Sequence, residues 1–422
     1  MKKKIALLLV LTMMSGTVVS ASTLDSQKVS AADSQDGSAA LSGSITFAHH
    51  RTDLEPRLNE MVDAFMEEHP DVTVELEIVA DYANIMSIRA AGNELPDVFE
   101  LETDTITPDK WAEYCMPLNE SRLYDKVQGQ SYYTVDDCVY AFSSSSSYLG
   151  FMYNKDLYTE AGITEVPTTW AEFKSAMEKL KALDGVIPIT SMYKTSWALS
   201  YWINMYANSL RDGGLLNSWV ETDTPFSDEM VIKVLDNLKD LADADLMDPD
   251  LMSSDWDLQA ADFAAGTIGT YLIGSFANET MTSLGMDENS IGFFALPALE
   301  KGEKPLIMTT VGRGYCVNKD SENKEAALAF CEFVTENSAK YLGFLSPIIG
   351  EECSIPSINE MLAQDATIVS RERVSDDYNG INAIAAINLG AVIQEYLVAE
   401  DKGEVIAKYN DIWAAARTEY FN

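Results

Sequence analysis

Alternating and helical spacings of apolar residues divide the start of the folded chain into clear elements. Ile45 and Phe47 alternate with small or polar residues, which predicts a strand over 44–50. Apolar residues then recur at helical spacing over 54–65, and alternation returns over 72–78. Strand, helix and strand in this order predict a β-α-β unit, and such units form parallel sheets with right-handed crossovers.

A further strand and then several helices follow this unit. The stretch LPDVFEL at 95–101 predicts another short strand, so this part of the chain has an α/β pattern. Helical patterns dominate after Gly150, where Thr169 and Glu172 form the T-x-x-E signature of a capping box. Five consecutive serines at 143–147 lie between the two regions, and such a run suits a crossover between lobes.

The segment YLGFMYNKDLYTEAGITEVPTTWAEFKSAMEKL, at 148–180, resembles the central segment of family 1 extracellular solute-binding proteins, the sugar-binding subunits of ABC importers. Its order is physically reasonable, because Asn154 and Asp156 can cap a short helix and Gly162 can take the positive φ that ends it. Four other segments resemble landmarks of the same family in the family's order: MVDAFMEEHPDVTVELEIV, DFAAGTIGTYLIGSFA, GFFALP and GYCVNKDSENKEAALAFCEFV. The resemblance spans roughly 44–422.

The resemblance implies an α/β fold of the two-lobed periplasmic-binding-protein type, with a ligand cleft between the lobes and crossover hinges. We expect an N-lobe of 44–144 plus 314–362 and a C-lobe of 145–313 plus 363–422. Hinges are expected near 143–147, 307–313 and 357–365. The implied function is to capture a sugar or oligosaccharide outside the cytoplasm and deliver it, as a monomer without cofactor or catalysis, to the membrane permease subunits of an ABC importer.

Candidate ligand contacts are polar or aromatic residues just after predicted strands, because strands point their carboxyl ends at such a crevice. The resemblance gives Asp104 the position of an acidic ligand residue and Phe276 the place where many relatives carry a stacking tryptophan. Trp197 and Trp202 are spaced five apart, so we expect one of them to lie in the core. The predicted ligand-binding set is His50, Arg51, Thr52, Glu102, Asp104, Ser147, Tyr148, Trp197, Trp202, Trp256, Phe276, Arg313, Tyr378 and Asn379.

The formal net charge of −38 narrows the possible ligands. Removal of Lys2, Lys3 and Lys4 with a signal peptide leaves 26 basic against 67 acidic residues, a net charge of −41. Such a field repels phosphate backbones, which excludes nucleic acid, and it disfavours polyanionic ligands. A neutral mono- or oligosaccharide fits the charge, since sugars need aromatic faces and polar partners for their hydroxyls.

The N-terminus reads as a secretory signal. Basic residues precede an apolar run over 5–14 and small residues at 19–21, which predicts a signal peptide of 1–21 cleaved after Ala21. A small and polar stretch over 22–43 predicts a flexible leader. No cysteine precedes Cys115, so the sequence does not support lipid anchoring, and we expect an exported protein in a periplasm or at the outer face of the envelope.

Several alternatives remain open from the sequence. The chain could be a solute-binding protein for a peptide, a polyamine or a phosphorylated polyol, or a secreted glycosidase with a pair of carboxylates. The two histidines at 49–50 lack a matching Cys/His cluster, so we predict no metal site there. The acidic run at 243–257 lacks the spacing of a calcium loop and is expected to be solvated. A bridge between Cys115 and Cys138 is possible, but the five cysteines do not form a disulfide scaffold.

Overall fold

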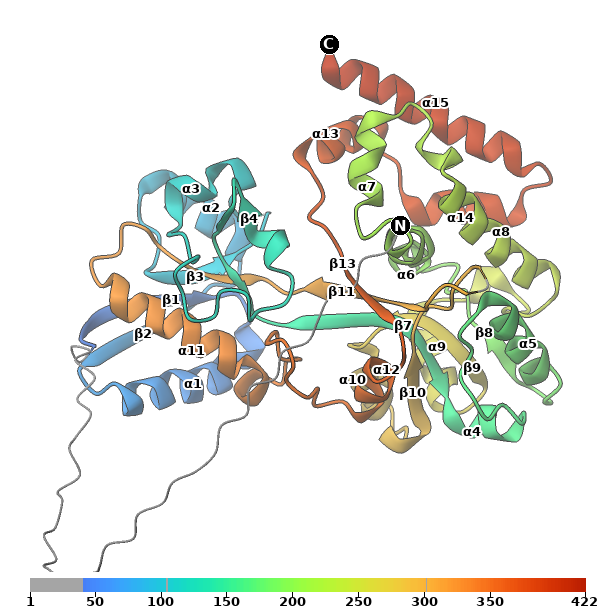
Figure 1. Cartoon of the computed structure of the whole chain (residues 1–422), viewed down its shortest axis with the longest axis horizontal. Helices are drawn as coiled ribbons and strands as arrows, with labels where there is room; N and C mark the ends of the chain where they lie inside the picture. The colour runs from blue at the N-terminus through green and yellow to red at the C-terminus, as the bar shows by residue number, and fades with distance from the viewer. Residues whose placement is uncertain (1–40, 104, 301) are drawn as a thin grey trace, which may run out of the picture. The chain divides into compact units, whose positions relative to one another are not determined.

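The computed structural model describes residues 41–103, 105–300 and 302–422 (Figure 1). The predicted signal peptide and nearly all of the predicted leader lie outside these residues. Gly43, the last residue of that leader, is already the first residue of strand β1, so the described chain enters its first sheet at the boundary that the apolar pattern predicts.

The first sheet contains five strands in the order β2-β1-β3-β12-β6. Its strands are β1 Gly43–His49, β2 Val72–Ile78, β3 Val98–Leu101, β6 Phe142–Ser143 and β12 Gly314–Val317. Strand β1 pairs in parallel with β2 and β3, which confirms the predicted β-α-β unit, and β12 pairs antiparallel to β3. Helices α1 (Glu55–Glu68) and α11 (Lys324–Leu342) pack on this sheet through the rings of Phe47, Phe65 and Phe330.

The second sheet has the order β13-β11-β7-β9-β8, with β10 paired to β7. Its strands are β7 Ser146–Asn154, β8 Ile187–Ile189, β9 Ile268–Gly274, β10 Ile291–Phe294, β11 Leu306–Val311 and β13 Thr367–Ser370. A two-stranded hairpin, β4 Thr134–Val135 with β5 Cys138–Val139, completes the strands of the described chain. The fold is α/β, as the sequence predicts.

The predicted helix starts in the central segment are confirmed. Asn154 accepts hydrogen bonds from the amides of Asp156 and Leu157 at the start of α4 (Lys155–Glu160), and Gly162 beyond its end has φ +68°. Thr169 caps α5 (Trp170–Lys181) in a complete capping box with Glu172. The buried face of α5 carries Trp170, Phe173, Met177 and Leu180, as its spacing predicts.

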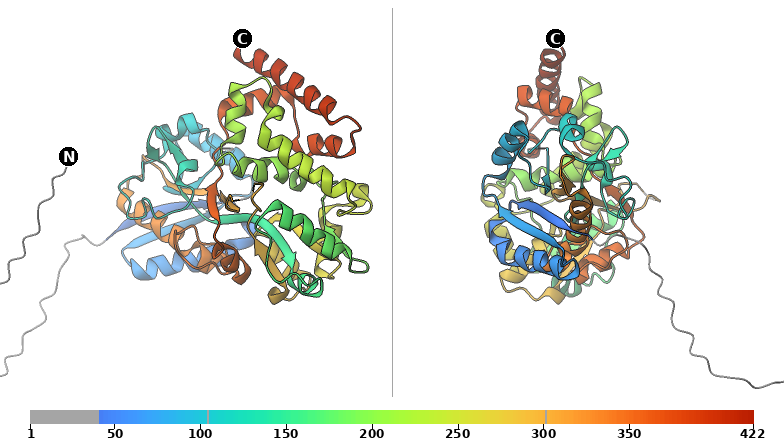
Figure 2. Two further views of the ribbon diagram at one scale, coloured as in Figure 1. Left: turned by 45° about the vertical axis from the view of Figure 1, so that its right-hand side comes forward. Right: turned by 90° about the vertical axis from the view of Figure 1, so that its left-hand side faces the viewer.

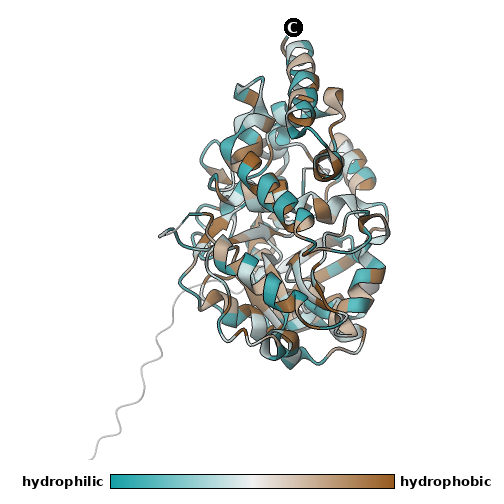
Figure 3. Ribbon diagram, turned by 90° about the vertical axis from the view of Figure 1, so that its right-hand side faces the viewer, coloured by the Kyte–Doolittle hydropathy of each residue, from teal (hydrophilic) through white to brown (hydrophobic). Residues whose placement is uncertain are grey.

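Further helices cover both sheets (Figures 1 and 2), and Figure 3 shows that they carry both hydrophilic and hydrophobic residues. Their bounds are α2 Tyr82–Gly92, α3 Trp111–Tyr114, α6 Ser196–Leu199, α7 Leu215–Ser218, α8 Glu229–Asp243, α9 Trp256–Ala264, α10 Ala277–Ser283, α12 Pro356–Leu362, α13 Asp376–Ala385, α14 Leu389–Val398 and α15 Lys402–Phe421, with a π-helix at Trp202–Ala207. No single described helix is long and apolar enough to cross a membrane, and α13 and α14 meet that test only as a pair bent by 54°.

Two segments cross side by side between the sheets. One joins β6 to β7 through 144–145, and the other joins β11 to β12 through Gly312 and Arg313. The Ser144 amide donates to the carbonyl of Arg313 at 2.9 Å, and the Gly312 amide donates to the carbonyl of Ser145 at 2.9 Å. A Cβ at Gly312 would lie 2.3 Å from the Ser145 hydroxyl oxygen and 2.9 Å from that of Ser144, so a larger residue would have to displace these hydroxyls.

A third segment also connects the two sheets, and its position differs from the prediction. We expected 314–362 in the N-lobe and a hinge over 357–365, but α12 lies within these residues and packs against β10. Its Ile358 and Met361 are fully buried in one core with Met152 and Tyr271 of the second sheet. Helix α12 therefore goes with the second sheet, and the third crossing lies between the end of α11 and the start of α12. The other lobe boundaries stay a prediction.

The role of the capping box at the start of α5 can be tested by mutation. Thr169→Ala removes the hydroxyl that accepts the Glu172 amide, and we expect the free energy of unfolding to fall by about 1 kcal/mol. Urea unfolding followed by circular dichroism measures this change. Thr418→Ala is the control, because Thr418 is exposed within α15 and bonds only the carbonyl of its own helix. An equal effect of both changes would contradict the capping role.

Candidate ligand-binding site

The carboxyl ends of several strands gather the predicted contacts at one edge of each sheet. In the first sheet β1 ends before His50, β3 ends before Glu102, and Arg313 directly precedes the antiparallel strand β12. In the second sheet β9 ends shortly before Phe276, and antiparallel β7 begins beside it with Ser146 and Ser147. The topology thus brings residues far apart in the sequence to these edges.

A buried carboxylate organises the edge of the first sheet. Glu100 on β3 is 1% exposed, and its Oε2 accepts the His50 backbone amide at 2.8 Å and lies 2.7 Å from His50 Nδ1. Its Oε1 lies 3.4 Å from Nε2 of the fully buried His49. Burial alone would raise the pKa of Glu100, but the charges and hydrogen bonds of the two histidines lower it below its usual value. Burial lowers the pKa of His49 to about 4. At neutral pH, Glu100 is therefore ionised and His49 neutral.

This group corrects one sequence-level expectation. We found no cluster that could make the histidine pair a metal site, yet His49, His50 and Glu100 place three ligand-type atoms within 4.8 Å of one another. The hydrogen-bond pattern assigns these atoms another role, because the Arg51 amide donates to His49 Nδ1 at 3.1 Å. A neutral His49 must then carry its proton on Nε2, which faces Glu100 and is not free to bind a metal.

The remaining contacts predicted from the first sheet lie around this carboxylate. Arg313 donates to Thr105 Oγ1 at 3.2 Å and lies over the Tyr82 ring, while Glu102 accepts a hydrogen bond from Tyr132 at 2.9 Å. Arg51 lies near enough to His49 to help lower its pKa, and Thr52 is exposed at the start of a short 3-10 helix. Asp104 lies outside the described residues.

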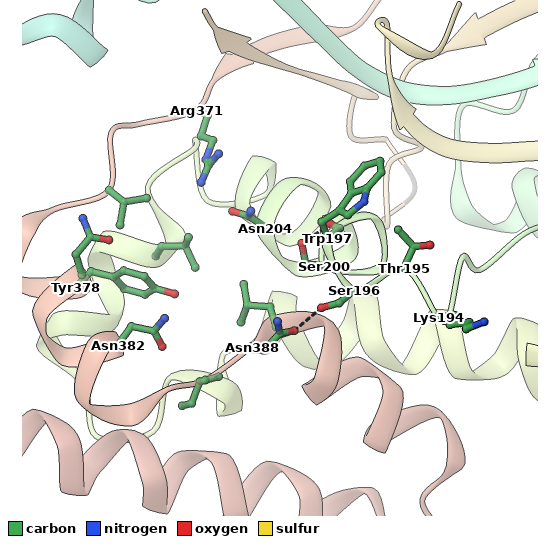
Figure 4. Close-up of a pocket in the computed structure, with 15 residues that line it drawn as sticks. Lys194, Thr195, Ser196, Trp197, Ser200, Asn204, Arg371, Tyr378, Asn382 and Asn388 are labelled. Carbon is green, nitrogen blue, oxygen red and sulfur yellow. Dashed lines mark hydrogen bonds between the residues drawn. The ribbon is translucent and has the colours of Figure 1, made fainter. Parts of the chain in front are cut away.

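A pocket of about 780 Å³ lies at the edge of the second sheet. Figure 4 shows its walls, which come from α6 and the π-helix on one side and from α13 with the β13–α13 and α13–α14 connections on the other. A Cβ at Gly390 would lie 2.4 Å from the Ser196 carbonyl, so this glycine lets α14 approach α6. The lining residues are Lys194, Thr195, Ser196, Trp197, Ser200, Asn204, Leu216, Arg371, Val374, Tyr378, Asn379, Asn382, Ile387, Asn388 and Leu389.

Three aromatic side chains form a cluster beside the pocket. The ring centroids of Trp197 and Trp256 are 5.7 Å apart, and each lies 6.2 Å from that of Phe276. Trp197 is 44% exposed and Phe276 46% exposed, although rings of this size are normally buried. Phe276 lies against Gly274 at the end of β9, where a Cβ would meet the ring at 2.9 Å. The cluster therefore offers open aromatic faces at the strand end.

Trp202 is a correction to the predicted set. It is 2% exposed and packs against Phe151, Trp170 and Tyr206 in the core of the second sheet. This confirms that one of Trp197 and Trp202 is a core residue, and it removes Trp202 from the ligand contacts. Its place is inside the π-helix, on the side that faces the sheet.

The other predicted contacts have mixed roles. Tyr378 lines the pocket but is only 7% exposed, and burial raises its pKa to about 12, so its hydroxyl stays protonated. Asn379 is exposed in the pocket wall. Tyr148 is buried, and its hydroxyl accepts a hydrogen bond from Gln128 at 2.8 Å, while the Ser147 hydroxyl lies 3.2 Å from that of Ser275. These two residues of β7 therefore support the site edge rather than line the pocket.

Several lining residues were missed by the sequence analysis. Arg371 directly follows β13, so the strand-end rule would have found it if that four-residue strand had been predicted. Asn204, Ser196 and Asn388 come from helices and their caps, where no strand-end signal exists. The hydrogen bond from Ser196 to Asn388, 2.6 Å long, joins the two walls.

Two predictions outside the site are also settled. The five cysteines are all free thiols, so Cys115 and Cys138 form no bridge, and Cys331 is buried in the core as expected. The acidic run at 243–257 is not simply solvated, since Asp248 is 7% exposed and accepts hydrogen bonds from Ser191.

The buried His49 gives a testable dependence of stability on pH. Its lowered pKa means that the unfolded chain binds a proton first as the pH falls from 6.5 towards 4, so the folded state loses stability in that range. The lowered pKa of Glu100 adds a loss in the same direction at lower pH. We expect the free energy of unfolding to fall by about 2 kcal/mol between pH 7 and pH 5 because of His49.

Urea unfolding of the parent and of His49→Gln at pH 7, 6 and 5 measures this contribution. The variant should show a flatter dependence on pH. His69→Gln controls for the loss of a histidine in general, because His69 lies at the end of α1. Identical pH dependences of the parent and His49→Gln would contradict the assignment.

Comparisons with known proteins agree with this architecture. The sequence model of the family described as bacterial extracellular solute-binding protein matches residues 51–341. A multiple sugar-binding protein of Streptococcus mutans is 25% identical over 142 residues, which cover 33% of this chain and 34% of that protein. The melibiose/raffinose/stachyose-binding protein MelE of Bacillus subtilis is 29% identical over 133 residues, 29% of each chain. The matches thus span about a third of the length of these relatives.

Solved structures show the same fold over most of the chain. The apo form of RafE from Streptococcus pneumoniae has a TM-score of 0.70 at 18% identity and covers 90% of this chain and 99% of its own. A mannobiose complex of a binding protein of an ABC transporter, from Bifidobacterium animalis subsp. lactis, has a TM-score of 0.66 at 20% identity, covering 90% and 95%. Fold, strand-end site and the match over 51–341 together lead to one conclusion. The chain belongs to the family of bacterial extracellular solute-binding proteins.

Proposed function

We propose that this protein binds a mono- or oligosaccharide through the second-sheet pocket and the aromatic cluster of Trp197, Trp256 and Phe276. The observation that carries the proposal is the exposure of these rings beside a pocket lined with amides and hydroxyls. Sugar rings have apolar C–H faces that pack on aromatic rings, and each of their hydroxyls needs a hydrogen-bonding partner. The pocket offers both kinds of contact side by side.

Buried acceptors strengthen the match to a hydroxyl-rich ligand. Asn204 Oδ1 and Asn382 Oδ1 line the pocket, are buried and have no hydrogen-bond partner among the described residues. Leaving such atoms unpaired costs free energy, so they are expected to be satisfied when a ligand binds. Sugar hydroxyls are donors that could satisfy them.

The names of similar proteins support the same ligand class. The relatives from S. mutans and B. subtilis are described as sugar-binding proteins, and neighbouring solved structures contain mannobiose, mannotriose and raffinose. We propose by analogy that this chain delivers its sugar to the membrane permease subunits of an ABC importer, acting as a monomer at the outer face of the envelope or in a periplasm.

The competing functions find less support in the pocket. A glycosidase needs a pair of carboxyl groups beside the scissile bond, but no Asp or Glu occurs among the residues that line the pocket. A polyamine receptor needs opposed carboxylates, whereas this pocket presents the cations Lys194 and Arg371. We therefore propose binding without turnover. The net charge of −38 argues for a neutral saccharide, whereas the charges in the pocket decide whether one acidic group is accepted.

The aromatic cluster supplies the test. Stacking beyond simple burial is worth on the order of 1 kcal/mol per ring, so Phe276→Ala and Trp256→Ala should each weaken saccharide binding about fivefold to tenfold. Leu284→Ala is the matched control, because Leu284 is 50% exposed at the end of α10, the helix that Phe276 precedes.

A thermal-shift screen of raffinose, stachyose, manno-oligosaccharides and chitin oligosaccharides first selects a ligand, since a ligand that binds only the folded state raises the melting temperature. Calorimetry then compares the variants, with circular dichroism as the folding control. Parental affinity in both aromatic variants would show that the cluster is not the sugar platform.

A further inference from the structure

An unpaired cation in the pocket indicates more about the ligand. Arg371 lines the pocket directly after β13, and its Nε is buried without a hydrogen-bond partner. Among the described residues, no Asp or Glu side chain forms an ion pair with its guanidinium. In Figure 4 its side chain extends from this strand end towards the part of the pocket that holds Asn204 and Tyr378.

The surroundings of Arg371 make this arrangement unusual for the chain. Acidic residues outnumber basic ones by 67 to 29, and Arg89, Arg122, Arg211 and Arg417 each pair with a carboxylate. Arg371 instead lies near the phenol groups of Tyr132, Tyr201 and Tyr378, whose pKa values its charge helps to lower against the stronger effect of burial. The buried Nε of Arg371 has therefore lost hydration without gaining a hydrogen-bond partner.

The second cation of the pocket is not equivalent. Lys194 lies 3.7 Å from the carboxylate of Asp255, and its side chain is 62% exposed. The charge of Lys194 is therefore already balanced by Asp255 at the rim of the pocket. Arg371 is thus the pocket cation whose partner is missing within the described chain.

We propose that the saccharide carries a carboxylate, as in a uronic acid residue, and that this carboxylate binds Arg371 while the sugar hydroxyls donate to Asn204 and Asn382. The inference rests on the proposed saccharide-binding function and adds the charge of the ligand to it. The planar fork of an arginine matches the two oxygens of a carboxylate, which gives both geometry and charge recognition. The unpaired acceptors Asn204 Oδ1 and Asn382 Oδ1 suit hydroxyl groups and cannot bind a carboxylate, so the pocket separates the two kinds of ligand group.

One acidic group is also compatible with the acidity of the whole chain. The net charge of −38 acts at long range and is screened within about 8 Å at physiological ionic strength, whereas a contact to Arg371 acts at hydrogen-bonding distance. A polyanion would meet the unfavourable field over its whole length. A saccharide with a single carboxylate brings only one negative charge into this field, and the contact with Arg371 compensates that charge.

The test compares matched acidic and neutral sugars on the full-length protein. The probes are disaccharides that contain glucuronate or galacturonate, and the same disaccharides after chemical reduction of the carboxylate to a primary alcohol. Calorimetry should show that the parent binds at least one acidic probe ten times more tightly, or better, than its reduced form. Arg371→Gln should remove this preference, Arg371→Lys should retain part of it, and the affinity for the reduced sugar should change less than threefold in both variants.

Arg89→Gln is the control, since Arg89 on α2 pairs with Glu77 on β2 and lies outside the pocket. Its preference should equal that of the parent, and melting curves verify that all variants fold. Equal or tighter binding of the reduced sugars by the parent, or an equal loss of both probes in Arg371→Gln, overturns the inference and leaves the proposed function intact. No binding of any acidic or neutral saccharide, including those of the thermal-shift screen, overturns both.

Discussion

The close contact between the two crossing segments at Gly312 is the constraint on which the site depends. Backbone hydrogen bonds tie 144–145 to Gly312 and Arg313, and the missing Cβ of Gly312 makes room for the Ser145 hydroxyl. Because β7 and β11 run from this point into the second sheet and β6 and β12 into the first, the contact fixes which strand ends face the ligand. A side chain at Gly312 would have to displace the hydroxyls of Ser144 and Ser145 from this contact.

The charged side chains at the edges of the two sheets have different roles. The first sheet buries Glu100 between two histidines, so its negative charge is used within the protein and is not offered to a ligand. At the second sheet, Arg371 has no carboxylate partner among the described residues, and amide side chains lie around it. The protein therefore keeps an acidic surface for solubility and a local positive potential where a ligand group would bind. The aromatic cluster adds apolar area next to this potential, which is the combination that an acidic sugar requires.

Much of the fold followed from the sequence, since the β-α-β unit, the capping box at Thr169 and the turn at Gly162 depend on local patterns. The side of the fold to which α12 belongs could not be predicted, because its seven residues carry no signal for which sheet buries Ile358. The spacing of Trp197 and Trp202 predicted that one of them lies in the core, but not which one, because the burial of Trp202 depends on contacts with Phe151 and Trp170 from distant parts of the chain. The pairing of Glu100 with His50 joins residues 50 positions apart and becomes visible only when β1 and β3 are aligned. Arg371 was missed for a similar reason, since β13 is short and mostly exposed.

We propose that the two sheet edges form parts of one site that closes about the crossing segments. Small-angle scattering of the protein with and without a saturating saccharide tests this claim most directly, with a sugar that gives no thermal shift as the control. We expect the radius of gyration to decrease only with the bound saccharide. An unchanged radius at saturation, established by calorimetry on the same sample, would contradict a site shared between two moving lobes.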